Sequence, residues 1–318
     1  MRPPAGSGEG SDGRGDSMIR HLDGKVAIVT GGAGGIGTQI SKIFAEQGAK
    51  VIVADTGADV EGRMGVDPSR VNAVVDAIKA KGGTAISAVG DIAEMDVAEG
   101  LVKTALDTFG KLDIVVAAHG ILRERMIFNM TEDDWDGVVR AHLKGCFTMS
   151  KFASIHWRQT RAGGRLIYFT SGAGVRGSAG QPNYAAAQAG KIGLMLSCAN
   201  ALGRYGVTAN CISPSASTRM TDRFREENRA VGSDSAEGTD RDPKNIVPPI
   251  VYLASDSGAD VTGRVVQVQG HRIAVWREMH AEKTIYWRDP VWDIDTLFQV
   301  MPETLAAEPD IMMPPRRG

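Results

Sequence analysis

The sequence predicts an α/β protein built around a doubly wound parallel sheet, and three observations support that fold class. Short, nearly continuous apolar segments recur along the chain, and between them apolar residues follow helical spacing. Strands that alternate with helices form βαβ units, whose helices cover both faces of a parallel sheet. A glycine-rich turn follows the first apolar segment directly, at residues 31–37. We expect about seven strands in one domain that spans residues 21–270.

The predicted strands share one character, because each is a short run of mainly apolar residues, as expected when both faces of a strand are buried. In chain order they lie at residues 25–30, 50–54, 84–89, 112–117, 165–169, 208–212 and 265–268. The predicted helices lie at residues 36–44, 68–81, 97–109, 132–160, 184–203 and 243–254. Pro68 fits the first turn of its helix, where a backbone N–H is not needed.

Three segments do not follow this alternation. Residues 1–20 hold few apolar side chains, so we expect a disordered N-terminal extension. Residues 215–242 are polar and charged, and a connection of this length is typical of a lid over a substrate site. Residues 271–318 form an aromatic-rich C-terminal extension. It contains Trp276, Trp287 and Trp292, large side chains that we expect to pack on the domain or on a neighbouring subunit.

The composition argues against several classes of function. A net charge of -2 provides no positive field for nucleic acid. No window offers the roughly 18 consecutive apolar residues of a membrane-spanning helix. Cys146, Cys198 and Cys211 form no CxxC pair, which argues against a disulfide framework or a structural zinc site. Sparse free cysteines fit a reducing compartment, so we expect a cytoplasmic protein without a metal.

The glycine-rich turn indicates a dinucleotide site. Glycines after a first strand permit a tight turn, let backbone N–H groups approach a pyrophosphate, and direct the N-terminus of the next helix at it. The residues in this pattern are Gly31, Gly32, Gly35, Ile36 and Gly37.

Acidic residues end the next two predicted strands. Asp55 lies where a carboxylate can accept both hydroxyls of an adenosine ribose and would repel a 2′-phosphate. No Arg or Lys follows it before Arg63, so NAD is favoured over NADP. Asp91 and Ile92 follow the third strand, where an adenine ring would lie with its amine against Asp91.

Ser171 and Tyr184 are thirteen positions apart, a spacing that hydride-transfer enzymes use. As hydride leaves a carbinol carbon, a proton leaves its oxygen, so a proton acceptor must lie within hydrogen-bond reach. A phenol has an unperturbed pKa near 10 and needs nearby positive charge to act as a base at neutral pH. Residue 188 shares a helix face with Tyr184, but it is Gln188, and the nearest lysine is Lys191.

Together these motifs resemble the short-chain dehydrogenase/reductase family over about residues 23–270. The resemblance rests on Thr30-Gly31-x-x-x-Gly35-x-Gly37, Asp55, Asp91, Ser171, Tyr184 and Pro214. Residues 120–125, 142–147, 180–184 and 218–221 are most similar to the (3R)-hydroxyacyl-CoA dehydrogenase domains of multifunctional β-oxidation enzymes and their bacterial relatives. The resemblance implies a Rossmann-type fold and an NAD-dependent oxidoreductase. Its substrate would be a secondary alcohol or ketone of a bulky apolar molecule: a hydroxyacyl thioester, steroid, terpene or polyketide.

The resemblance also implies roles for particular residues. Tyr184 would be the general acid/base, and Ser171 would orient the substrate oxygen. Further cofactor contacts would come from Ala118, His119, Gly120, Tyr184, Gln188, Pro214, Ser215 and Thr218. Helices corresponding to residues 132–160 and 184–203 pair across two-fold axes in the family, so we expect a homotetramer or homodimer.

The sequence departs from the family at four places. Gln188 replaces a lysine that lowers the tyrosine pKa and holds the nicotinamide ribose, and Lys191 is either a substitute cation or an ordinary surface or interface lysine. His119 lies in Ala-Ala-His-Gly, where the family has Asn-Asn-Ala-Gly. His142 replaces an Asn of the catalytic relay, and Ser215 replaces a Gly. Each histidine is either functional or a hydrogen-bonded packing residue.

Two functions from different classes therefore remain. The intact serine, tyrosine, acid and glycines favour an NAD-dependent dehydrogenase. The altered lysine and asparagine positions favour a protein that keeps the fold without redox turnover, which would be a non-redox enzyme, an inactive partner subunit or a binding protein.

Overall fold

The computed structural model describes residues 19–222, 233–276, 283–286 and 293–305. In these ranges one eight-stranded sheet has the order β3-β2-β1-β4-β5-β6-β7-β8. The strands are β1 Val26–Thr30, β2 Lys50–Asp55, β3 Thr84–Val89, β4 Ile114–Ala117, β5 Gly164–Phe169, β6 Val207–Ser215, β7 Val265–Gln269 and β8 Arg272–Val275. The first seven strands pair in parallel, and β8 returns antiparallel to β7.

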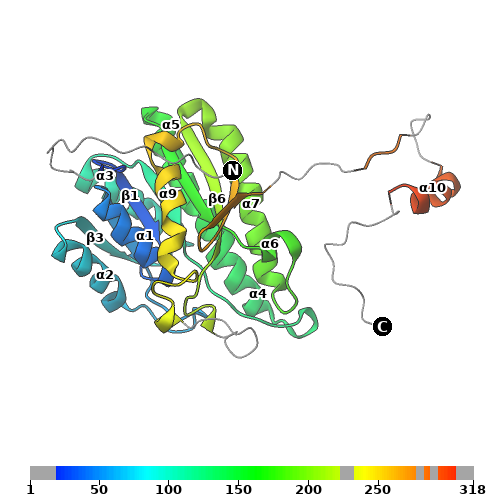
Figure 1. The fold of residues 1–318 in the computed structure, drawn as a ribbon, viewed down its shortest axis with the longest axis horizontal. Helices are drawn as coiled ribbons and strands as arrows, with labels where there is room; N and C mark the ends of the chain where they lie inside the picture. The colour runs from blue at the N-terminus through cyan, green and yellow to red at the C-terminus, as the bar shows by residue number, and fades with distance from the viewer. Residues whose placement is uncertain (1–18, 223–232, 277–282, 287–292, 306–318) are drawn as a thin grey trace, which may run out of the picture.

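Most of the helices form two layers around this sheet (Figure 1). Their bounds are α1 Gly35–Glu46, α2 Pro68–Ala80, α3 Met95–Phe109, α4 Glu132–Val139, α5 Gly145–Thr160, α6 Ala173–Arg176, α7 Pro182–Leu202, α9 Val247–Ala254 and α10 Ile294–Val300. One core cluster joins α1, α2 and α9 to the sheet, and the other joins α3, α5 and α7 to the opposite face. The predicted doubly wound fold is confirmed.

The predicted helix at 132–160 is not one continuous α-helix. A π-helical turn, η2 (Arg140–Lys144), separates α4 from α5. Such a turn contains one extra residue, so it changes the faces on which the following side chains lie, and it is frequent at functional sites. Here it buries His142 against Gly120 and Tyr184 and directs Arg140 toward Asp91, which follows β3.

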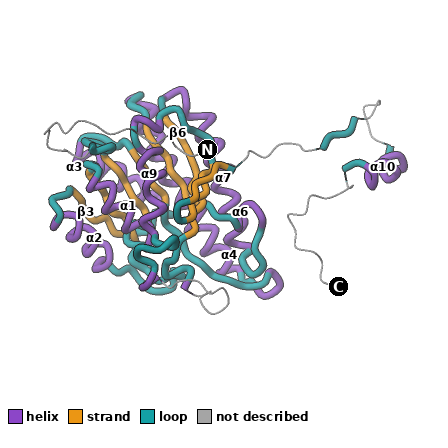
Figure 2. Tube along the Cα trace, viewed as in Figure 1, coloured by secondary structure: helices purple, strands orange, loops and turns teal. Residues whose placement is uncertain are grey.

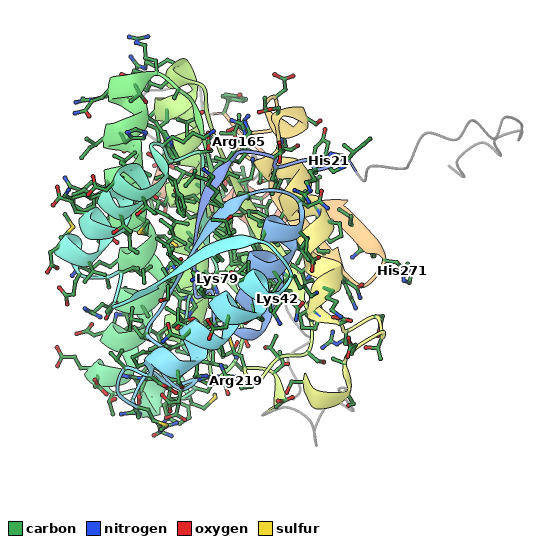
Figure 3. The ribbon with its side chains drawn as sticks, turned by 90° about the vertical axis from the view of Figure 1, so that its left-hand side faces the viewer. His21, Lys42, Lys79, Arg165, Arg219 and His271 are labelled. Carbon is green, nitrogen blue, oxygen red and sulfur yellow. The ribbon has the colours of Figure 1, made fainter. Side chains whose placement is uncertain are left out.

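The strand order reverses between β1 and β4, which are neighbours although β2 and β3 intervene in the chain. Loops that leave the two strands there diverge to opposite faces of the sheet, and the crevice between them is the usual ligand site of such folds. Figure 3 shows the two ends of the molecule. Arg165 near the start of β5 lies at one end, and Arg219 after the end of β6 lies at the other.

The structure describes parts of the two predicted extensions and of the predicted lid. Of the three tryptophans in the C-terminal extension, Trp276 is described, and its ring packs partly buried against the α3–α5–α7 cluster. Trp287 and Trp292 lie outside the described residues, as do residues 1–18 and 223–232. The short helix α10 stands apart from the sheet (Figures 1 and 2). Ser217 N donates to Arg241 O at 2.9 Å, so the two ends of the predicted lid are adjacent.

Candidate active site

A cavity of about 470 Å³ lies along the carboxyl edge of the sheet, at the switch point between β1 and β4. Most of the predicted site residues line it. They are Gly31, Gly35, Ile36, Gly37, Asp55, Asp91, Ile92, Ala118, His119, Gly120, His142, Tyr184, Gln188, Lys191, Pro214 and Thr218.

Three predicted site residues do not line the cavity. Gly32 is buried, and a Cβ there would approach Val29 O to 2.8 Å, so this glycine allows close packing inside the turn. Ser215 accepts a 2.7 Å hydrogen bond from Arg241 Nη1, which turns its hydroxyl away toward a neighbouring loop. Ser171 lies at the rim, close enough to Tyr184 for its hydroxyl to affect the pKa of the phenol.

The glycine turn leaves backbone donors facing the cavity. Gly31 has φ +69°, and a Cβ there would lie 2.6 Å from the backbone of His119, so only glycine fits. Helix α1 begins at Gly35 after Gly34, and no side chain caps its N-terminus. The first N–H groups of the helix have no partner within it and suit a phosphate.

Asp55 links the end of β2 to this turn. One carboxylate oxygen accepts from Ala33 N at 2.9 Å, and the other accepts from Gly57 N at 2.8 Å. Each oxygen keeps a further lone pair, so the carboxylate can still accept ribose hydroxyls from the cavity side.

Asp91 has a partner that the sequence analysis missed. Arg140, on the π-helical turn, forms ion pairs with Asp91 and with Glu94. Burial raises the pKa of Asp91, but the bonds from Arg140 and from Ala93 N outweigh it, so the pKa lies below its ordinary value. An adenine amine would therefore meet a carboxylate already paired with an arginine. Nothing in the apolar spacing of the segment marks Arg140, because the π turn determines its direction.

Tyr184 lies on the first turn of α7, held there by Asn183. The Asn183 amide donates to Arg123 O at 3.0 Å and to Asp134 O at 2.8 Å, while its oxygen accepts from Tyr184 N at 2.7 Å. Burial raises the pKa of Tyr184, and hydrogen bonding from Gln188 and then from the rim serine lowers it by less. The imidazole of His142 meets the phenol ring edge-on, with centroids 5.1 Å apart and planes at 83°.

Lys191 lies beneath this group, fully buried, so the surface-lysine interpretation is wrong. Its Nζ is 3.0 Å from His142 Nδ1 and 2.8 Å from Phe169 O. Seven residues separate it from Tyr184, which is nearly two helical turns, so both side chains lie on the face of α7 that packs on the sheet. Burial lowers the pKa of Lys191, and burial together with the lysine charge holds the pKa of His142 well below its ordinary value.

His119 is a neutral part of the cavity floor. Its Nδ1 lies 2.6 Å from Thr30 Oγ1, and its Nε2 lies 3.9 Å from Cys146 Sγ. Burial, followed by the charge of Lys191, lowers its pKa to about 3. These contacts favour the packing interpretation of His119.

Gln188 provides a test of whether a dinucleotide fits. Its side chain is buried, yet its Oε1 has no hydrogen-bond partner among the described residues. A buried acceptor without a donor costs free energy, so it indicates a missing partner. A nicotinamide ribose hydroxyl is such a donor. Together with the free N–H groups of α1 and the carboxylate of Asp55, this acceptor fits an extended dinucleotide.

A protein-family model described as short chain dehydrogenase matches residues 25–229. The chain belongs to this family. It is therefore an oxidoreductase of the type that acts on CH–OH groups, and the family uses NAD or NADP. In the described ranges no group of three or more His, Cys, Asp or Glu side chains is placed to hold a metal ion, and no helix is long and apolar enough to span a bilayer.

One relative of this short-chain dehydrogenase is a hydroxyacyl-CoA dehydrogenase by name. The chain is 38% identical to hydroxyacyl-CoA dehydrogenase ChsB1 of Mycobacterium tuberculosis, over 86% of each chain. It is 38% identical to peroxisomal multifunctional enzyme type 2 of Mus musculus, covering 74% of this chain and 30% of the mouse protein. A crystal structure of a short chain dehydrogenase from Mycobacterium avium superposes with a TM-score of 0.77 at 40% identity, covering 90% of this chain and 96% of that one. The predicted resemblance is confirmed.

Proposed function

We propose that this protein is an NAD-dependent dehydrogenase that interconverts a secondary alcohol and a ketone on a bulky apolar hydroxyacyl thioester. The observation that carries the proposal is the placement of Tyr184 beside Ser171, Gln188 and His142 at one end of a cavity whose other end holds Asp55. The name of the Mycobacterium tuberculosis relative supports a hydroxyacyl thioester over a free steroid, terpene or polyketide alcohol.

Each residue at the head of the cavity has a role in this reaction. The Ser171 hydroxyl orients the substrate oxygen, and Tyr184 removes its proton as the C–H bond breaks. A nicotinamide, when bound, would supply the hydride acceptor. Gln188 Oε1 would accept a hydrogen bond from its ribose, and the neutral imidazole of His142 packs edge-on against the phenol ring.

Apolar side chains beside the catalytic rim suit a bulky acyl group. Ile127 and Phe128 are 64% and 76% exposed in a short 3-10 turn, and Val175 is exposed on α6. The turn is tied to the catalytic segment because Arg125 N donates to Gly180 O at 2.8 Å. Exposed apolar groups of this kind mark a ligand-binding surface.

NAD is the preferred dinucleotide in this proposal. The Asp55 carboxylate, fixed by two backbone N–H groups, would meet a 2′-phosphate with like charge. We also propose that the protein works in the cytoplasm as a homotetramer or homodimer.

Gln188 favours a second candidate, a protein that binds the dinucleotide without redox turnover. The amide can bind a ribose hydroxyl but brings no charge to Tyr184, whose pKa is raised by burial.

The two candidates are separated by one pair of measurements. NADH fluorescence titration measures binding, and absorbance at 340 nm measures turnover of 3-hydroxyacyl-CoA substrates at pH 7–10. Tyr184→Phe should abolish turnover and leave the NADH dissociation constant nearly unchanged, whereas Tyr252→Phe on the exposed face of α9 should change neither. Binding without turnover on any alcohol supports the second candidate, whereas full activity in Tyr184→Phe would exclude Tyr184 as the proton acceptor of the first.

A further inference from the structure

We propose that Lys191 is a positioning residue that fixes the tautomer and orientation of His142 beside Tyr184, in place of a cation that contacts the cofactor. The inference refines the dehydrogenase site proposed above and rests on that function only for its kinetic consequence. Its structural part can be measured without turnover.

The hydrogen bonds of His142 determine which ring nitrogen carries the proton. Nε2 lies 2.8 Å from Ile121 O, and a carbonyl oxygen can only accept, so Nε2 carries the proton. Nδ1 is then an acceptor, and Lys191 Nζ donates to it from 3.0 Å. Moving the proton to Nδ1 would point it at the lysine amine and leave the Ile121 carbonyl without a donor. The Ile121 carbonyl and the Lys191 ammonium group therefore favour the same tautomer, and Lys191 disfavours the other one because Nδ1–H and Nζ–H would both be donors.

The same amine joins the three elements that carry the catalytic groups. Lys191 belongs to α7, as Tyr184 does, and it bonds His142 on the π-helical turn. Its second acceptor is Phe169 O at the end of β5, two residues before Ser171. The other titratable groups that interact with Lys191 are buried cysteine thiols of α5 and β6 and the neutral imidazole of His119. The amine therefore has two fixed acceptors and no competing carboxylate among the groups that act on it.

The orientation of His142 affects the phenol directly. The imidazole packs edge-on against the Tyr184 ring, and the missing side chain of Gly120 leaves the space that the imidazole fills. An imidazole without its Nδ1 bond would keep only the bond to Ile121 O, so a ring flip or a change of tautomer would cost less free energy. The Tyr184 ring would then lose a fixed packing contact on one side and could shift. Displacement of a catalytic group by about 1 Å can lower the rate as much as 100-fold.

The first test is spectroscopic and needs no substrate. Two-bond ¹H–¹⁵N correlation spectra of the full-length protein, labelled with ¹⁵N-histidine, report the tautomer of each ring, and His142→Asn assigns the His142 signals. We expect a single Nε2–H tautomer for His142 at pH 7. A protonated Nδ1, or a mixture of tautomers, in the wild-type protein would overturn the proposal.

The second test removes the donor. Lys191→Met keeps the apolar stem and loses the amine, so His142 should show mixed tautomers, while Lys144→Met at an exposed position of the same π turn should leave the spectrum unchanged. An unchanged His142 spectrum in Lys191→Met would show that the lysine does not select the tautomer. If the Met variant does not fold, Lys191→Leu, which also lacks an N–H donor, is expected to shift the His142 signals in the same direction. An unshifted spectrum in that variant counts against the proposal equally.

The kinetic test separates positioning from cofactor binding. We expect Lys191→Met to lower kcat by about 10- to 100-fold with an unchanged NADH dissociation constant, and to have no further effect in a His142→Asn background. Equal losses in kcat and NADH affinity would mean that Lys191 contacts the cofactor. If no alcohol is oxidised by the wild-type protein, the proposed function fails, and the tautomer measurement still decides the role of Lys191.

Discussion

Tyr184 faces an amide where the family has a lysine, and this residue affects the pH at which the phenol can act. Burial raises the pKa of Tyr184, and the hydrogen-bonding neighbours Gln188 and Ser171 offset only part of that effect. Because the catalytic form is the phenolate, alcohol oxidation should continue to rise with pH well above pH 8.

Replacing the amide by a cation should shift this dependence. In Gln188→Lys, the ammonium group favours the phenolate, so the apparent pKa of alcohol oxidation should fall and the rate at pH 7 should rise by up to about 10²–10⁴-fold. Gln188→Met is the matched control, since it fills the same space without charge or hydrogen bonds. The measurement is kcat against pH for both variants. A pH profile in the Lys variant that coincides with that of the wild type would contradict the role assigned to charge at this position.

A second residue-scale prediction concerns cofactor choice. Asp55→Ala removes the carboxylate that would repel a 2′-phosphate, so the ratio of NADP(H) to NAD(H) dissociation constants should fall toward one. Calorimetric titration of both cofactors measures the ratio, and Asp76→Ala, on the exposed face of α2, serves as the control. Tighter binding of NADP(H) by the wild-type protein would show that the Asp55 interpretation is wrong.

At the scale of secondary structure, the sequence was informative where burial alone determines the element. Central strands such as β1 and β4 are buried and apolar on both faces, so their positions follow from hydrophobic runs. Strand β8 (Arg272–Val275) was missed because it is a short, mostly exposed edge strand whose three apolar residues fall in the segment expected to be a C-terminal extension. The π turn was missed because it changes the hydrogen-bond register without changing the apolar spacing. For the same reason the directions of Arg140 and His142 were not predictable.

The site residues show the same division. Gly31 directly follows a predictable strand and Asp55 ends the next one. Their positions in the site therefore follow from the strand positions and could be predicted from the sequence. The position of Lys191 depends on which acceptors lie beneath α7, and only the structure shows the Phe169 carbonyl and His142 Nδ1 there.

Asn183 makes the start of α7 sensitive to substitution. Its amide satisfies two backbone carbonyls, and its oxygen accepts from the backbone N–H of Tyr184. Asn183→Ala would leave these buried groups without partners, so the free energy of unfolding should fall by about 1–3 kcal/mol. Urea unfolding followed by circular dichroism measures the change, with Asn72→Ala on the exposed face of α2 as the control. A change below about 0.5 kcal/mol, the usual size for surface substitutions, would contradict this account.

For the whole molecule, the buried neutral histidines predict how stability depends on pH. His119 has a folded-state pKa of about 3, and the pKa of His142 is also far below 6.5, the value expected for both in the unfolded chain. Between those values the unfolded chain binds protons that the native protein does not. Stability should therefore fall as pH drops below 6.5, with each histidine adding up to about 1.4 kcal/mol per pH unit.

Denaturant unfolding at several pH values between 7.5 and 5 measures this slope. His119→Asn and His142→Asn should each reduce it, whereas His21→Asn, at an exposed position, should not. A slope that is unchanged in both buried variants would show that these imidazoles are not the groups responsible.

The surfaces of α5 and α7 favour self-association. Phe147, Ile155 and Leu196 are exposed large apolar residues on these helices. Burial of such side chains between copies related by two-fold symmetry is the expected use. Light scattering at micromolar concentration should give the mass of a homotetramer, and Phe147→Glu should shift it toward smaller species. A monomeric wild-type protein would contradict the prediction.

The His142 ring fills the space that a side chain at residue 120 would need. This restricts the order in which the two residues can be substituted. A Cβ at residue 120 would collide with the ring carbon Cε1 of His142. An alanine at 120 becomes tolerable only in a descendant whose residue 142 has already lost its ring, so the two substitutions are not additive. A lineage that acquired the histidine first is confined to glycine at 120. A library that varies the two positions one at a time would discard an alanine that the double change accepts.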